Sequence, residues 1–175
     1  IKITGYFESR TKPESHNTQF IESMAIYHYI RDLVGNKRVL DAGCAFGYGV
    51  NYLSGYAKEI VGTDLNLKII RWADKHYHKR NIKFVLSDII NLSFREKSFD
   101  VACLFEVIHH VQEYQELIEE ARRVIKENGL FLISTRNKTE VKPEYTHIHI
   151  FTPEELKELL LKSGFDNIQI YGLNR

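Results

Sequence analysis

Three polar side chains that can do acid–base chemistry stand close together in the chain, at Glu106, His109 and His110. Residues three and four apart lie on one face of a helical turn, so this spacing predicts that the three side chains converge. A neutral imidazole titrates near neutral pH and can accept a proton from a hydroxyl or an amine. We therefore take these residues as candidate catalytic groups. The alternative is a turn whose histidines cap the following helix and touch no substrate.

A second candidate site is the stretch 38–53, where an apolar strand runs into a turn of small residues. Asp41 ends the strand, and Gly43, Ala45 and Gly47 alternate with larger residues. Glycine permits positive φ and a close approach of backbone to ligand, and the helix that follows presents unpaired N–H groups. This pattern predicts binding of an anionic or carboxylate-bearing ligand, with a bland tight turn as the alternative. The dinucleotide fingerprint G-x-G-x-x-G fails with its first glycine set on Gly43 or on Gly47, which argues against a nicotinamide dehydrogenase.

Acidic residues also end two later apolar runs, at Asp64 after EIVGT and at Asp88 after the run 82–87. In open α/β sheets, ligands bind outside the carboxyl ends of the strands, and a carboxylate after the second strand can accept both ribose hydroxyls of a nucleoside. The alternative for Asp64 is a surface aspartate in a turn.

These candidates are carried by strands that alternate with helices. Helical periodicity predicts helices at 13–34, 48–57, 66–79, 114–125 (ended by Asn128-Gly129) and 152–163. Apolar runs predict strands at 37–42, 59–64, 82–87, 101–105, 130–134 and 165–171. Such alternation predicts a doubly wound, mostly parallel α/β sheet flanked by helices.

Composition indicates one globular domain. The chain has 175 residues, of which 43% are hydrophobic and 27% charged, with a net charge of +1. That balance argues against strong, unspecific binding of polyanions. There is no apolar run of membrane-spanning length, and residues 1–10 hold no signal-peptide core, so we expect a cytoplasmic protein without a membrane partner.

Several ordered motifs together resemble the class I S-adenosylmethionine-dependent methyltransferases, in their small-substrate branch. The motifs are DAGCAFG, the strand-end acids, FDVACLFEVIHHV, EARRVIKENGLFLIST and FTPEELKELLLKSGF. The resemblance implies a Rossmann-like fold, with residues 1–36 as a helical lid and 37–175 as the cofactor-binding domain. The family's final antiparallel edge strand would be truncated or absent.

The resemblance also implies how the cofactor is bound. The turn carrying Asp41, Gly43, Ala45 and Gly47 would face the methionyl part of S-adenosylmethionine, and Ala45 departs from the usual glycine. The remaining contacts implied are Asp64 and its neighbour Leu65 at the ribose, Asp88 and Ile89 at the adenine, and Phe105 in the pocket wall.

A metal site is the further alternative for the histidines. The ubiquinone-pathway O-methyltransferases and the small-RNA 2′-O-methyltransferases carry E-x-x-E-H at this point, where those residues bind a divalent ion. Here His109 takes the place of the second glutamate, which exchanges oxygen for nitrogen and shifts preference away from magnesium. His149 could complete a set with Glu106, His109 and His110.

We interpret the chain as a methyltransferase acting on an oxygen, nitrogen or carbon nucleophile of a small polar metabolite, such as a sugar. His147, His149 and Tyr145 lie in the polar loop expected near the substrate. We do not expect nucleic acid as a partner, but an RNA-modifying enzyme is retained as the second hypothesis. The third hypothesis is a non-catalytic cofactor-binding or scaffold subunit.

Overall fold

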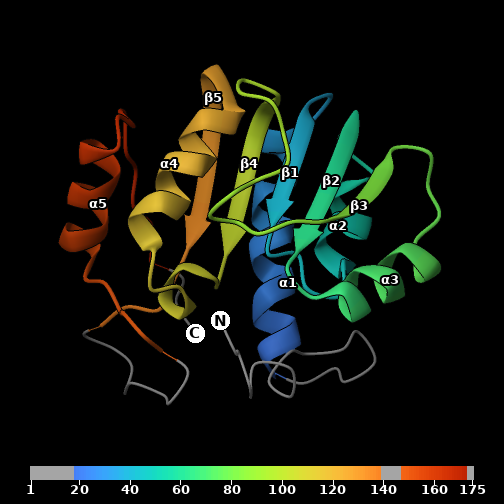
Figure 1. Cartoon of the computed structure of the whole chain (residues 1–175), viewed down its shortest axis with the longest axis horizontal. Helices are drawn as coiled ribbons and strands as arrows, with labels where there is room; N and C mark the ends of the chain where they lie inside the picture. Colours follow the sequence, from blue (N-terminus) through green and yellow to red (C-terminus); the bar gives the residue numbers. More distant parts are fainter. Residues whose placement is uncertain (1–17, 139–146, 173–175) are drawn as a thin grey trace.

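A computed structural model describes residues 18–138 and 147–172. Its five strands form one parallel sheet in the order β3-β2-β1-β4-β5 (Figure 1). The strands are β1 (Arg38–Ala42), β2 (Glu59–Asp64), β3 (Ile82–Leu86), β4 (Phe99–Phe105) and β5 (Ile125–Ser134). The helices are α1 (Thr18–Ile30), α2 (Tyr48–Leu53), α3 (Leu67–His76), α4 (Tyr114–Val124) and α5 (Pro153–Lys162), with the 3-10 turns η2 (Arg31–Val34) and η3 (Ile108–His110). The predicted doubly wound α/β architecture is confirmed.

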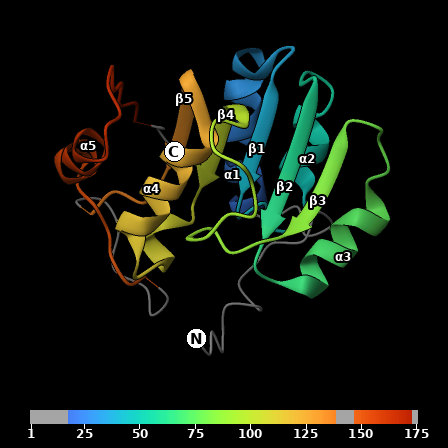
Figure 2. The ribbon, with the colours of Figure 1, turned by 45° about the horizontal axis from the view of Figure 1, so that its top comes forward.

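Helices cover both faces of the sheet. On one face, α1, α2 and α3 pack against residues such as Val39 of β1, and on the other face α4 and α5 pack against residues such as Leu40. Successive residues of a strand point to opposite faces, which is why a fully apolar strand suits this double layer. Figures 1 and 2 show α4 in front of the sheet and α1 behind it.

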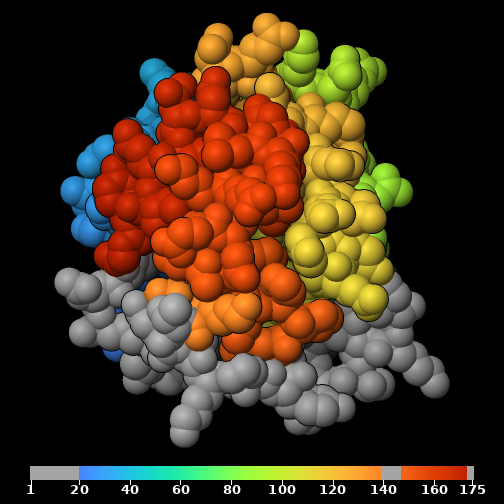
Figure 3. All heavy atoms as spheres, turned by 90° about the vertical axis from the view of Figure 1, so that its left-hand side faces the viewer, coloured from blue at the N-terminus to red at the C-terminus, as the bar shows by residue number. Residues whose placement is uncertain are grey.

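The prediction of a strand at 165–171 is wrong, because these residues form no strand in the structure. Phe165 stacks on Phe131 with ring centroids 5.0 Å apart, and Ile168 packs against the core, but Ile170 and Tyr171 are exposed. Asn167 has a φ of 51°, which interrupts the extended run before it could pair along its length. Figure 3 shows α5 and the residues that follow it covering this side of the molecule beside α4.

The boundary between α4 and β5 also differs from the prediction. The helix ends at Val124 rather than near Asn128-Gly129, and β5 begins at Ile125 rather than Leu130. Ile125 pairs with Phe99 and Leu130 with Val101, so the register shifts between the two pairs. The turn signal at Asn128-Gly129 therefore marks an irregularity within the strand and not its beginning.

The leading helix is shorter than predicted within the described residues, because it tightens into η2 after Ile30. Residues 13–17 lie outside the part that the structure describes, as does most of the proposed lid segment 1–36, whose separation from 37–175 stays a prediction. Among the described residues, none of the helices combines the length and apolar character needed to cross a membrane. Cytoplasmic localisation likewise stays a prediction.

Candidate functional site

The turn between β1 and α2 is built from left-handed backbone. Gly43, Ala45 and Gly47 have φ values of 77°, 47° and 74°. The N–H groups of Gly43 and Cys44 both donate to the carbonyl of Thr63, each at 2.8 Å, which fixes the turn to the end of β2. An alanine in this region costs roughly 1–2 kcal/mol of backbone strain that glycine avoids. Ala45, which replaces the usual glycine, therefore keeps the left-handed backbone of the turn at the cost of strain.

Two glycines of this turn are required by neighbours far away in the chain. A Cβ added at Gly43 would lie 2.6 Å from Cγ2 of Val107, and one at Gly47 would lie 2.6 Å from Cε1 of Phe84 on β3. Val107 directly precedes η3. The glycine turn and the histidine-bearing turn after β4 therefore touch each other at the carboxyl edge of the sheet.

Three carboxylates lie at the carboxyl ends of three neighbouring strands: Asp41 is the last residue but one of β1, Asp64 ends β2, and Asp88 comes just after β3. Asp41 and Asp64 are each only 1% exposed, and Asp88 is half-buried. One oxygen of Asp64 accepts from the N–H of Asn66 at 2.9 Å, and one oxygen of Asp88 accepts from the N–H of Ile90 at 3.2 Å. These local bonds fix the orientation of both acids.

Asp41 lies in an environment that disfavours its ionised form. Burial raises the pKa of Asp41 from 3.8 to about 7, the hydroxyl of Tyr27 opposes this by donating a hydrogen bond, and the charge of Asp64 adds to the rise. The distance from the Tyr27 hydroxyl to Oδ2 of Asp41 is 3.0 Å. Asp41 therefore changes protonation near neutral pH.

Tyr27 on α1 is a site residue that the sequence reasoning missed. Its ring packs edge-to-face against Phe105, with centroids 5.3 Å apart, and against Tyr48 at 6.0 Å. A Cβ added at Gly49 would collide with this ring. The only sequence signal was its place in the apolar stripe of the leading helix, which indicated a core position.

The apolar residues predicted to line the cofactor pocket occupy three separate places. Leu65 is 54% exposed beside Asp64, whereas Ile89 is half-buried and packs against the core face that carries α4. Phe105 is half-buried at the end of β4, in contact with Tyr27. All three lie at the edge where the acids gather, but their contacts with a cofactor stay predictions.

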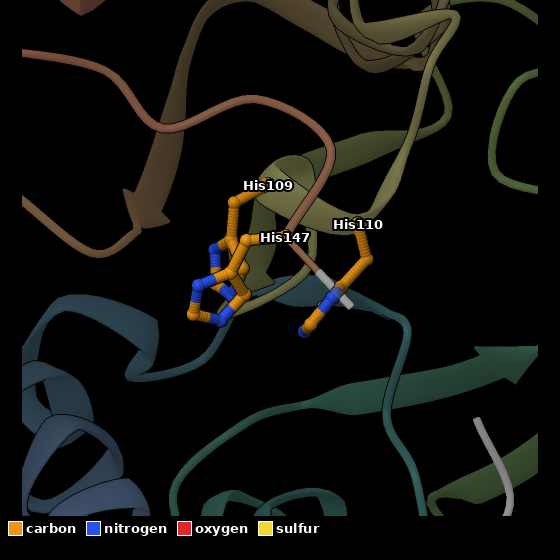
Figure 4. A group of neighbouring side chains, drawn as sticks. All are labelled: His109, His110 and His147. Atoms are coloured by element: carbon orange, nitrogen blue, oxygen red, sulfur yellow. The ribbon is translucent and has the colours of Figure 1, made fainter. Parts of the chain in front are cut away.

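Three histidines form a cluster at the turn after β4. His109 and His110 come from η3 and His147 from the segment before α5, and one ring nitrogen of each lies within 4.8 Å of the others (Figure 4). His109 is 2% exposed, and its Nδ1 lies 2.9 Å from Oγ1 of Thr135. Burial, and then the neighbouring His110, His147 and Arg136, lower the pKa of His109 to about 3. His109 is therefore a neutral imidazole.

Glu106, which the sequence places with His109 and His110, is not a member of the histidine cluster. Glu106 precedes η3 and has a φ of 57°, so the helical spacing rule does not apply to it. Its Oε1 accepts from Oγ of Ser134 at 3.0 Å, and its Oε2 forms an ion pair with Nε of Arg136 at 3.1 Å. Among the described residues, the cluster of potential metal ligands does not include it.

His147, and not the expected His149, completes the cluster. The N–H groups of Ile148 and His149 donate to the carbonyl of His109 at 2.8 and 3.4 Å, which brings this segment against η3. The ring of His149 instead stacks on Tyr114 of α4, with centroids 5.0 Å apart. Tyr145, the other candidate in this loop, lies outside the described residues.

Comparison with known proteins identifies the family. Residues 40–133 match the model of a family described as "Methyltransferase domain". A probable S-adenosylmethionine-dependent methyltransferase of Mycobacterium tuberculosis is 25% identical over 181 residues, which cover 99% of this chain and 64% of that protein. A fatty-acid O-methyltransferase of Mycolicibacterium smegmatis is 30% identical over 128 residues, which cover 70% of this chain and 44% of that protein.

The solved structure of an S-adenosylmethionine-dependent methyltransferase from Mesorhizobium loti superposes with a TM-score of 0.72, at 20% identity and over 83% of each chain, and so shares the fold. The chain spans less than two thirds of the length of both curated relatives. The family match extends over more than half of this chain. The chain therefore belongs to the methyltransferase domain family, the class I S-adenosylmethionine-dependent methyltransferases that its motifs resemble, and S-adenosylmethionine is the cofactor that this family uses.

Proposed function

We propose that this domain transfers a methyl group from S-adenosylmethionine to a small polar acceptor held beside the histidine cluster. The observation that carries the proposal is the placement of Asp41, Asp64 and Asp88 at the carboxyl ends of three adjacent parallel strands, next to the left-handed turn. Ligands of open α/β sheets bind at this edge, and three acids suit a ligand with an ammonium group, ribose hydroxyls and an amino-substituted base.

Each acid has a part in cofactor binding under this proposal. Asp64 accepts hydrogen bonds from the ribose hydroxyls, and exposed Leu65 beside it offers an apolar surface. Asp88 accepts from the adenine amino group, and Ile89 packs on the ring. Asp41 and the turn at 43–47 lie against the methionyl part. When bound, S-adenosylmethionine supplies an activated methyl group on a sulfonium.

Positioning is the main contribution of the protein to such a reaction. Holding the acceptor atom in line with the transferred group converts a bimolecular step into an effectively unimolecular one. A base is needed only if the acceptor must lose a proton. Buried His109 is a poor base because of its low pKa. Half-buried His110 is the better candidate for taking a proton.

The proposed acceptor class is argued from the histidine cluster. The name of the Mycolicibacterium smegmatis relative states a fatty acid as its acceptor. The polar histidine cluster of this chain instead favours an acceptor with a hydroxyl or amine, such as a sugar or another polar metabolite. An RNA acceptor and a non-catalytic role are the competing functions.

Isothermal titration of the chain with S-adenosylmethionine and S-adenosylhomocysteine, with NAD as the control ligand, tests the cofactor assignment first. Micromolar binding of both, without binding of NAD, supports it. A screen of polar metabolites for methyl transfer by mass spectrometry then tests the acceptor. Salt-dependent RNA binding with methylation of RNA would favour the RNA enzyme, because phosphate contacts weaken with salt. Cofactor binding without any turnover, or no binding, would favour the scaffold.

A further inference from the structure

The histidine cluster is a group of three side chains that the methyl-transfer proposal does not require as a unit. His109, His110 and His147 come from two segments that are distant in the chain, yet one nitrogen of each lies within 4.8 Å of the others. Across residues 18–138 and 147–172, no other three histidine, cysteine, aspartate or glutamate side chains gather in this way. Such convergence of imidazoles is typical of metal ligation.

The scaffold around the cluster holds two segments in register. The carbonyl of His109 accepts from the N–H of Ile148 at 2.8 Å. On the other side, Phe151 forms an isolated parallel bridge with Asn137, and its carbonyl accepts from the N–H of Lys138 at 3.1 Å. His147 is therefore held beside η3 by bonds on the residues that follow it.

His109 has the surroundings of an oriented ligand. It is 2% exposed, and its Nδ1 lies 2.9 Å from Oγ1 of Thr135. Metal-ligating histidines usually bond a second polar group through the ring nitrogen that does not bind the metal, which sets the ring orientation. With Nδ1 engaged by Thr135, Nε2 is the nitrogen available for coordination.

The distances are within reach of a coordination sphere. Zinc–nitrogen bonds of about 2.0–2.1 Å in a tetrahedron separate the nitrogens by about 3.3–3.4 Å. The nitrogens here lie within 4.8 Å of one another, so the cluster has to contract. His109 is 2% exposed, whereas His110 and His147 are half-buried, so the contraction involves chiefly the last two.

We propose that His109, His110 and His147 bind one divalent transition-metal ion of the Zn²⁺ type. Three imidazole ligands suit zinc, iron, nickel or copper, whereas magnesium and calcium prefer oxygen. Three protein ligands also leave a coordination position open for water or a substrate oxygen. Arg136, the nearby cation, is paired with Glu106, which offsets its repulsion of a metal ion.

The open position gives the metal a role in the chemistry. A substrate hydroxyl bound to the ion would lose its proton to bulk water more readily than the free hydroxyl does. The resulting oxygen anion would form the new bond to the methyl carbon as the bond from that carbon to sulfur breaks and S-adenosylhomocysteine leaves. This second step rests on the proposed function, but metal binding itself does not. An oxygen acceptor would then be favoured over a nitrogen or carbon acceptor.

The test is a titration of the full chain, purified without a polyhistidine tag and stripped with a chelator, with Zn²⁺ by calorimetry and with Co²⁺ by visible absorption. One saturable equivalent is expected, with Co²⁺ d–d bands of the intensity typical of four-coordinate sites. His110→Ala and His147→Ala should each weaken binding by at least about 10-fold, and Thr135→Val by about 10-fold or more through loss of ring orientation.

His149→Ala is the matched control, because His149 lies in the same segment but stacks on Tyr114. It should bind metal as the unaltered chain does. His109→Ala could fail to fold because the residue is buried, so the half-buried pair carries the test, with circular dichroism confirming their fold. Absence of saturable binding, or equal loss in His147→Ala and His149→Ala, would overturn the proposal. A separate calorimetric titration with S-adenosylhomocysteine shows whether the chain binds the cofactor product even if it binds no metal.

Discussion

Two regions of the proposed site differ in how they are built. On the side proposed to bind the cofactor, Asp41, Asp64 and Asp88 lie at or just beyond the ends of their own strands. On the side proposed to bind the acceptor, His109 meets His147 only through contacts between distant segments. Parallel pairing of β1, β2 and β3 is enough to bring the acids to one edge. The histidines need backbone bonds between η3 and residues 148–149 as well.

Because of this difference, substitutions in the two regions should have different consequences. A side chain on the cofactor side can be replaced while the strand that carries it keeps its place, because the sheet is held by backbone hydrogen bonds. The acceptor side depends on a loop docked against a 3-10 turn. We therefore expect cofactor binding to respond to single charges and the acceptor side to respond to docking of residues 147–151.

The largest expected effect concerns the buried charge of Asp41. Its pKa rises from 3.8 to about 7 in the folded chain, so the unfolded chain loses this proton first as pH increases. Stability from this group is complete below about pH 4 and is lost as pH rises through about 7, with an upper bound of about 4 kcal/mol. Urea unfolding between pH 4 and 8 should show this loss, and Asp41→Asn should remove it. Asp74 is exposed on α3, so Asp74→Asn should leave the loss of stability with pH unchanged. Identical pH profiles for the unaltered chain, Asp41→Asn and Asp74→Asn would contradict the raised pKa of Asp41.

Next in size is the effect of Asp64→Asn on cofactor affinity. Loss of a charged hydrogen-bond partner costs about 1.5–3 kcal/mol, which is a rise in Kd of roughly 10–100-fold. His110→Ala should change the same Kd by less than about threefold, because the proposed cofactor contacts do not include His110. Calorimetry with S-adenosylhomocysteine measures both. If the two variants have the same affinity, the division into two sides fails.

A smaller effect is expected where α1 meets the cofactor side. In Gly49→Ala the added Cβ collides with the ring of Tyr27. We expect a net loss of about 1–3 kcal/mol in the free energy of unfolding from overpacking, despite the better helix propensity of alanine. The comparison is Gly55→Ala, where an added Cβ meets a carbonyl oxygen at an ordinary 3.5 Å. Equal urea midpoints for the two variants would show that the contact between Tyr27 of α1 and Gly49 of α2 does not limit stability.

The smallest effect is that of Ala45→Gly. Relief of the left-handed strain is opposed by the greater entropy of glycine in the unfolded chain, so stability should rise by less than about 1 kcal/mol. Removal of the methyl group should also raise cofactor affinity by a few-fold. Thermal unfolding and calorimetry check the two effects. Ala25→Gly, in the right-handed backbone of α1, should change stability in the opposite direction, and a loss in both variants would count against strain at Ala45.

Local patterns were reliable where one element contained the whole signal. The five strands of the sheet and the acids at the carboxyl ends of β1, β2 and β3 could be predicted because apolar runs, turn residues and charges are adjacent in the chain. The same reasoning failed at Ile125–Gly129 and at 165–171. There a register shift against β4, and a left-handed residue at Asn167, override the local preference.

The sequence by itself determined the fold class, the family and the edge of the sheet at which the three acids gather, because these depend on periodicity and on motifs within single elements. Only the tertiary structure decided that Tyr27 contacts Asp41, that Glu106 pairs with Arg136, and that His147 rather than His149 joins His109. Each of these three contacts joins segments that are distant in the chain and depends on the direction in which a side chain points. That direction is set by packing and by backbone hydrogen bonds such as those from residues 148 and 149 to His109, which no local pattern encodes.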